Sequence, residues 1–167
     1  MTTHREPDRE IKENNVTDAL VGVFDAAPEA QVSSNTVTAT TFGILLLSSG
    51  TVESNDILNS AYGVFVVADG AKIHSNRITL ANIAGVELAC FNGTVSDNKI
   101  NDAAIGLDQV SSSVKGSNSF ANTGVISTNG CVAAAASASS IQAPSRAAGP
   151  GSFSQWRTPA NPSGLRP

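Results

Sequence analysis

Aromatic residues are scarce in this chain: they make up 5% of its 167 residues, although hydrophobic residues as a whole make up 41%. A core with few aromatic rings must be filled by Val, Ile and Leu, which suits a narrow tube. The sequence also lacks a run of about 18 apolar residues, so it predicts no membrane-spanning helix. Its first ten residues are polar and lack the apolar segment of a secretory signal. This favours either an intracellular chain or a piece of a longer exported protein.

Basic residues and cysteines are few as well. Residues 1–131 hold 7 Lys and Arg against 14 Asp and Glu, a net charge of −7. Such a charge argues against nucleic acid as a partner, because its phosphates would be repelled. The two cysteines, Cys90 and Cys131, lie far apart in the sequence pattern. We expect two reduced, largely buried thiols in preference to a disulfide.

A six-residue pattern centred on asparagine recurs along the chain. In each copy an apolar residue is followed by two small or polar residues, an asparagine, one polar residue and a second apolar residue. The clearest copies are residues 32–37, 52–57, 73–78 and 95–100, and residues 11–16 and 114–120 also fit, the last with one inserted residue. Successive copies begin 21, 20, 21, 22 and 19 residues apart. The chain is therefore a repeat protein with a period near 21.

The second half of each repeat has a glycine followed by alternating apolar residues, at Gly22, Gly43, Gly63 and Gly85. Two or three short strands per repeat, with no helical periodicity, amount to one coil of a parallel β-helix. Parallel crossovers are almost always right-handed. The sequence thus predicts an all-β, right-handed parallel β-helix of about six coils over residues 11–131. A charged lead over residues 1–10 precedes it, and an Ala-, Ser-, Pro- and Gly-rich tail over residues 132–167, expected to be disordered, follows.

The recurring asparagines have a structural role in this prediction. Equivalent residues of successive coils lie above one another, so stacked amides can pass hydrogen bonds along a ladder. Asparagine also tolerates the left-handed backbone of a sharp bend. The expected ladder consists of Asn35, Asn55, Asn76 and Asn98. A second polar turn is expected at Asp18, Asn59, Asn82, Asp102 and Asn122.

The asparagine pattern and the glycine-led strands together resemble the right-handed β-helix of the pectate lyase-like superfamily and the related carbohydrate-binding and sugar-hydrolysis repeats. The resemblance covers residues 11 to about 131. It implies a fold and a general link to carbohydrate. It does not imply one activity, because the superfamily contains lyases, hydrolases, epimerases, phage tailspikes and inert spacers.

Charged residues that flank the asparagines are candidates for catalysis. A uronate lyase or epimerase needs a cation or metal to neutralise the substrate carboxylate and a base to remove a proton. Arg77 or Lys99 as base and His74 as proton relay would supply the catalytic groups. Glu53 and Asp56 would form the metal site, with calcium as the metal if one binds. The alternative is an exposed ladder of ion pairs without catalytic function.

An outward column on the glycine-led strands is the candidate substrate-binding surface. It consists of Phe24, Leu45, Phe65, Glu87 and Asp108. Large apolar side chains in the open usually mark a binding or assembly surface, so this stripe favours either a polysaccharide or another copy of the chain. Glu87 and Asp108 also have the spacing of a glycosidase pair, although isolated solvated carboxylates are the simpler interpretation.

The function that these patterns favour is a non-catalytic or incomplete β-helix module that binds polysaccharide. The alternatives are a lyase or epimerase on acidic polysaccharide, and a structural spacer or assembly element. No cofactor is expected other than calcium at the acidic pair. Neither nucleic acid nor membrane is expected as a partner.

Overall fold

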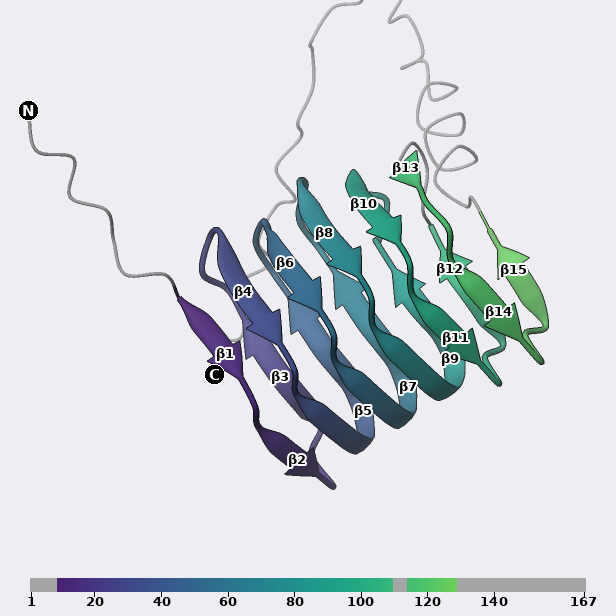
Figure 1. Cartoon of the computed structure of the whole chain (residues 1–167), viewed down its shortest axis with the longest axis horizontal. Coiled ribbons are helices and arrows are strands. Elements are labelled where there is room, and N and C mark those ends of the chain that lie inside the picture. Colours follow the sequence, from purple (N-terminus) through teal and green to yellow (C-terminus); the bar gives the residue numbers. More distant parts are fainter. Residues whose placement is uncertain (1–8, 110–113, 129–167) are drawn as a thin grey trace, which may run out of the picture.

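Fifteen β-strands and no helix occur in residues 9–109 and 114–128, the part of the chain that the computed structural model describes. No helix in these ranges is therefore long and apolar enough to span a membrane. The strands wind as a right-handed parallel β-helix, and each coil adds one rung to the stack in Figure 1. The predicted fold is confirmed.

The first sheet takes one short strand from each of six rungs. All its strands are parallel and follow one another in chain order. They are β1 (Glu10–Lys12), β4 (Ala30–Ser33), β6 (Gly50–Glu53), β8 (Ala71–His74), β10 (Gly93–Ser96) and β13 (Val114–Lys115).

The remaining strands form a second, bent sheet. In the three central rungs each is an unbroken strand of 11 residues: β5 (Thr36–Leu46), β7 (Asp56–Val66) and β9 (Arg77–Glu87). In the outer rungs the same path is split into two short strands. These are β2 (Asn15–Thr17) and β3 (Val21–Asp25), β11 (Lys99–Asn101) and β12 (Ile105–Asp108), and β14 (Ser119–Ala121) and β15 (Val125–Ser127).

The helix consequently has three outward faces. The first face is the outer side of the first sheet. The second face is the outer side of β2, β11, β14 and the N-terminal halves of β5, β7 and β9. The third face is the outer side of β3, β12, β15 and the C-terminal halves of the same three long strands.

The core is filled by stacked aliphatic side chains. Because the strands are parallel and in register, each inward apolar residue lies beside an apolar residue of the next rung. Val52 pairs with Ile73 in this way, and Ile57 pairs with Ile78. These four side chains are fully buried. Burying one such side chain contributes about 1.5–3 kcal/mol. A narrow tube of Val, Ile and Leu was the core that the sequence predicted.

An asparagine ladder runs along the corner between the first and second faces. The predicted column is confirmed, and it extends by one residue at each end. Its members are Asn14, Asn35, Asn55, Asn76, Asn98 and Asn118. At each step the side-chain amide donates to the next asparagine Oδ1, for example from Asn76 Nδ2 to Asn98 Oδ1 over 2.9 Å.

The left-handed residue at this corner is not the asparagine. It is the residue just before it, with φ of 54° at Ser34, 55° at Ser54 and 58° at Ser75. The asparagine follows the bend with its amide turned inward, and that orientation lets it bond to the next rung. The expectation that asparagine itself takes the left-handed backbone is therefore wrong.

The second bend also differs from the expected one in the fourth rung. Positive φ values occur at Asp18, Asn59, Asp102 and Asn122, as the turn pattern predicted, but the fourth rung bends at Leu80 and not at Asn82. Asn82 follows within the strand and is exposed. The bend is set by the rung-to-rung register, which places Leu80 at this level although Asn82 has the better turn chemistry.

Cys90 is disulfide-bonded, which overturns the expected reduced thiol. The residue lies in the turn after β9 with φ of 71° and is exposed. A cysteine in a surface turn is accessible for bonding, unlike one in the core. Cys131, the other cysteine of the sequence, lies outside the described residues, as do the tail over residues 132–167 and most of the charged lead over residues 1–10.

Candidate functional site

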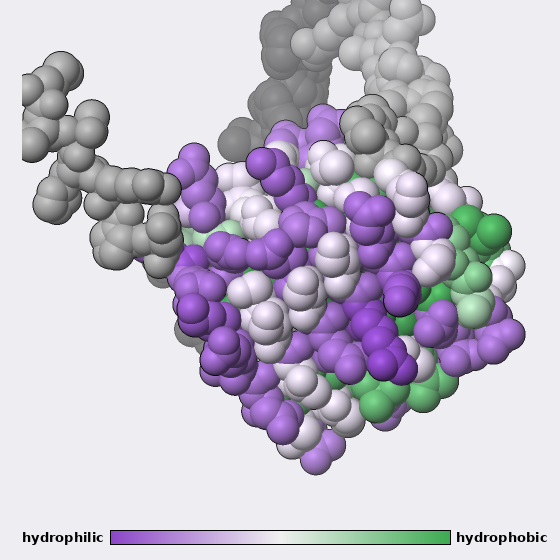
Figure 2. Space-filling model, in the orientation of Figure 1, coloured by the Kyte–Doolittle hydropathy of each residue, from purple (hydrophilic) through white to green (hydrophobic). Residues whose placement is uncertain are grey.

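The first face carries a small polar cluster around Glu53. His74 Nε2 lies 3.3 Å from Glu53 Oε2, on the neighbouring strand of the first sheet. Gln31 Nε2 donates a hydrogen bond to the other oxygen, Glu53 Oε1. Both Glu53 and His74 are half-buried. Glu53 is thus engaged by protein groups on both of its oxygens, and this face is otherwise mainly hydrophilic (Figure 2).

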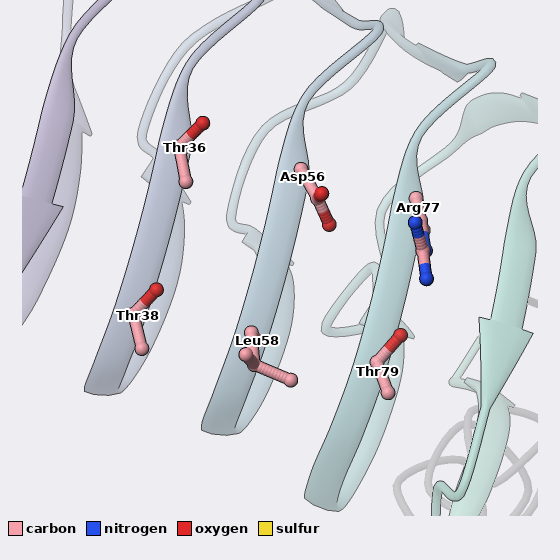
Figure 3. Close-up of a pocket in the computed structure, with 6 residues that line it drawn as sticks. All are labelled: Thr36, Thr38, Asp56, Leu58, Arg77 and Thr79. Carbon is pink, nitrogen blue, oxygen red and sulfur yellow. The ribbon is translucent and has the colours of Figure 1, made fainter.

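The second face has a shallow hollow of about 150 Å³ across three neighbouring strands (Figure 3). Its lining comes in pairs from β5, β7 and β9: Thr36 and Thr38, Asp56 and Leu58, and Arg77 and Thr79. Asp56, Arg77 and Lys99 follow one another in the strand register. All three are exposed, and the ion pairs found between described residues do not include one from Asp56 to Arg77. The hollow combines hydroxyls with one acid and one base.

The predicted catalytic and metal-binding residues are divided between these two faces. The structure brings His74 together with Glu53 on the first face, and Asp56, Arg77 and Lys99 together on the second. The asparagine corner lies between the two sets. Within residues 9–109 and 114–128, no three His, Cys, Asp or Glu side chains converge as metal ligands would. The catalytic and calcium assignments stay predictions, and the described geometry adds no support to them.

The third face brings the predicted substrate-binding column together. Phe24, Leu45, Phe65, Glu87 and Asp108 are direct neighbours in the strand register, one per rung. Phe24 is 55% exposed, and Leu45 and Phe65 are half-buried. Strand spacing in a sheet is about 4.8 Å, so the column alone runs for roughly 20 Å.

Two further aromatic residues complete this surface. The rings of Phe42 and Tyr62 are stacked, with centroids 5.3 Å apart and an interplanar angle of 8°. Phe65 meets both edge-on, at 5.4 Å from Phe42 and 5.1 Å from Tyr62. All three residues are half-buried, so each keeps part of its surface in solvent. We name Phe42, Tyr62 and Phe65 the ring cluster.

The sequence contains a signal for Phe42 and Tyr62 that the alternation pattern misses. Both stand directly before a repeat glycine, at Phe42-Gly43 and Tyr62-Gly63. Simple alternation from the buried Ile44 predicts that Phe42 points inward. Instead Gly43 occupies the inward-facing position, and the Phe42 ring points outward. Comparing the residue before each repeat glycine across the coils would have identified the column.

Glu87 and Asp108 continue the third face beyond the rings. Glu87 is 6% exposed, and both burial and the neighbouring Asp108 raise the pKa of its carboxyl. Asp108 Oδ1 accepts hydrogen bonds from the Gln109 backbone N–H over 2.8 Å and from the Thr128 hydroxyl. The pKa of Tyr62 is raised by burial and by the charges of Glu87 and Asp108, which places the ring cluster in the field of the acids.

Comparison with known proteins gives one family. The model of the family described as "Periplasmic copper-binding protein (NosD)" matches residues 2–140 of this chain. No curated protein and no solved structure matches the chain.

Proposed function

The chain belongs to the NosD family of periplasmic copper-binding proteins, and on this premise we propose that it is an exported β-helix module whose third face binds carbohydrate. The disulfide at Cys90 supports export, because disulfides form and persist in oxidising compartments such as the periplasm. We therefore prefer export to the intracellular alternative that the sequence left open.

Copper does not fit the described residues. It is held in proteins chiefly by imidazole, thiolate and thioether groups. In residues 9–109 and 114–128 the single histidine, His74, faces Glu53 and Gln31, and the single cysteine, Cys90, is already bonded. No set of three candidate ligands occurs there. We therefore derive no role for copper from this part of the chain.

The observation that carries the proposal is the ring cluster on an outward face. Buried rings would serve packing, but Phe42, Tyr62 and Phe65 keep part of their surface in solvent although the core is filled by aliphatic residues. Flat rings beside polar groups are suited to a pyranose, which has apolar C–H faces and hydroxyls at its edge. Phe24 and Leu45 lengthen the apolar surface toward the first rung, and Glu87 and Asp108 supply hydrogen-bond acceptors at the other end.

Affinity electrophoresis in gels that contain neutral, amine-bearing or acidic polysaccharides tests the proposal. At least one gel should retard the wild-type protein, and Phe65→Ala should lose the retardation because its ring is part of the platform. Leu58→Ala, which removes an exposed leucine from the second face, is the matched control and should be retarded like the wild type. Circular dichroism confirms that both variants are folded.

Two other outcomes would contradict the proposal. If Phe65→Ala shifts the sedimentation profile toward monomer and no polysaccharide is bound by either protein, the third face is an assembly surface. If a uronate polymer gives unsaturated products whose ultraviolet absorbance grows with time and is lost in Arg77→Ala or Lys99→Ala, the protein is a lyase that acts at the second face.

A further inference from the structure

Charge is distributed unevenly among the three faces. Lys12, Lys72 and His74 lie on the first face, and Arg77 and Lys99 on the second. The described part of the third face, from β3 to β15, contains acidic side chains and no Lys, Arg or His. A ligand on this face therefore meets aromatic rings and negative charge, without any basic group to neutralise an acidic sugar.

Of the two acids of this column, Glu87 is the one to which no described residue donates a hydrogen bond, whereas Asp108 accepts two. The residue is 6% exposed, and no described residue forms an ion pair with it. A carboxylate in a largely buried residue is unfavourable when it has neither a donor nor a cation beside it. Asp108, one rung away, adds a second negative charge and has donors of its own in Gln109 and Thr128.

Glu87 lies on the strand next to the ring cluster. Glu87 is the direct register neighbour of Phe65, and the next column places Ala84 beside Tyr62. Ala84 is fully buried and contributes only a methyl group beside the tyrosine. A sugar stacked on Tyr62 or Phe65 has its substituents within about one strand spacing, roughly 4.8 Å, of the Glu87 rung.

We propose that the third face selects amine-bearing sugars, with the sugar ring on Tyr62 and Phe65 and its ammonium group paired with Glu87 and Asp108. This inference rests on the proposed carbohydrate function and specifies its substrate class. The ammonium supplies the cation and the N–H donors that Glu87 lacks. The same cation is attracted to the faces of the neighbouring rings. Uronates are disfavoured because two acids would repel their carboxylates.

Calorimetric titration with three hexasaccharides tests the proposal at slightly acidic pH. The probes are a glucosamine oligomer, its N-acetylated counterpart with the same backbone, and a galacturonate oligomer. We expect the wild-type protein to bind the glucosamine oligomer at least about tenfold more tightly than the acetylated one, equivalent to about 1.4 kcal/mol. The galacturonate oligomer should bind weakest, and added salt should reduce the tenfold preference.

Two isosteric variants separate the local effect from net charge. Glu87→Gln should lower affinity for the glucosamine oligomer to the level of the acetylated oligomer, while leaving the acetylated oligomer unaffected. Asp56→Asn removes the same charge from the second face and should keep the wild-type preference. Both replacements preserve side-chain volume, and circular dichroism verifies their folding.

The outcomes distinguish this inference from the proposed function. Equal affinity for the glucosamine and acetylated oligomers, or an unchanged preference in Glu87→Gln, overturns the amine selectivity and leaves carbohydrate binding intact. Tightest binding of the galacturonate oligomer also overturns it. If none of the three oligomers and no polysaccharide gel binds the protein, the carbohydrate function itself fails.

Discussion

At the scale of single residues, an asparagine inside the ladder makes more hydrogen bonds than any described side chain on the outward faces. Asn76 Nδ2 donates to Asn98 Oδ1, to the Val52 carbonyl and to the His74 carbonyl, all within 3.0 Å. Its Oδ1 accepts from both nitrogens of Asn55. Asn76 is 1% exposed, so water cannot replace these partners.

Replacing Asn76 should reduce stability much more than replacing its exposed neighbour Arg77. Asn76→Ala should lower the free energy of unfolding by about 1–3 kcal/mol, since it leaves buried donors and acceptors unmatched. Arg77→Ala, at the following exposed position, should cost less than about 1 kcal/mol. Urea denaturation of the two variants measures the difference, and equal midpoints would contradict the ladder.

Glu87 predicts a pH dependence of stability. Its folded-state pKa lies above the ordinary value of 4.5, so the folded protein holds the proton more tightly than the unfolded chain does. The stability that this group contributes is complete below about pH 4.5 and is lost as the pH rises through the folded-state pKa. Glu87→Gln cannot ionise, and it should therefore be more stable than the wild type at neutral pH. Thermal melts over a pH series measure the difference in stability between the variant and the wild type, which should disappear in acid. A difference that is the same at every pH would show that ionisation of Glu87 is not its cause.

The sequence predicted the residues that repeat and missed those that depend on local packing. The column from Phe24 to Asp108 and the ladder follow from the period alone, and both are found. The outward turn of Phe42 and Tyr62 depends on which side of the strand each glycine occupies, and the burial of Glu87 depends on its surroundings. Neither is a property of the period, so the pattern could not supply them.

At the scale of the strand, the repeat glycines allow neighbouring rungs to approach at the third face. A Cβ atom on Gly63 would lie 2.5 Å from the Gly85 carbonyl oxygen and 2.6 Å from Ile78 Cγ2. Both contacts are with groups that are fixed by the neighbouring rung and the core. Only glycine therefore fits at this position. Because Gly63 occupies the inward-facing position, the preceding Tyr62 faces outward.

Gly63→Ala should consequently destabilise the protein by at least about 2 kcal/mol through overpacking. It should also weaken ligand retention, because displaced strands would separate the ring cluster. Gly70→Asn is the matched control: Gly70 has φ of 83° and no neighbour nearer than 3.6 Å to an added Cβ, and asparagine tolerates this backbone. Chemical denaturation compares the two variants, and equal losses would refute the role given to close approach.

The corners show why element boundaries are harder to predict than elements. The asparagine pattern correctly marks the first corner, yet the left-handed residue is Ser54 or Ser75 and not the asparagine that follows. At the second corner Leu80 bends because the rungs above and below bend at that level. Stacking between coils fixes the level of a bend, and a single repeat read alone does not contain that information.

At the scale of the whole molecule, a β-helix gains stability from contacts between adjacent rungs. The rungs of β5, β7 and β9 have neighbours on both sides, whereas β1 and β15 lie at the ends of the stack. Backbone amide hydrogen exchange should therefore be slowest in β5, β7 and β9 and fastest in the terminal strands. Exchange at one rate along the whole stack would indicate a single cooperative unit and contradict a graded solenoid.

The three faces give the molecule three different chemical surfaces on one scaffold. The first is hydrophilic with a Glu53–His74 pair, the second has a shallow hollow between an acid and a base, and the third is aromatic and acidic. We propose that ligand binds at the third face. Family membership alone would direct attention to copper, for which the described residues offer no site.

Nuclear magnetic resonance mapping of a bound glucosamine oligomer tests this assignment most directly. Backbone and aromatic resonances are followed while the oligomer is titrated into isotope-labelled protein. We predict the largest shifts at the ring cluster, Glu87 and Asp108, with little change at Asp56, Arg77 and Lys99. Shifts concentrated on the second face, with the ring cluster unchanged, would contradict the assignment of ligand binding to the third face.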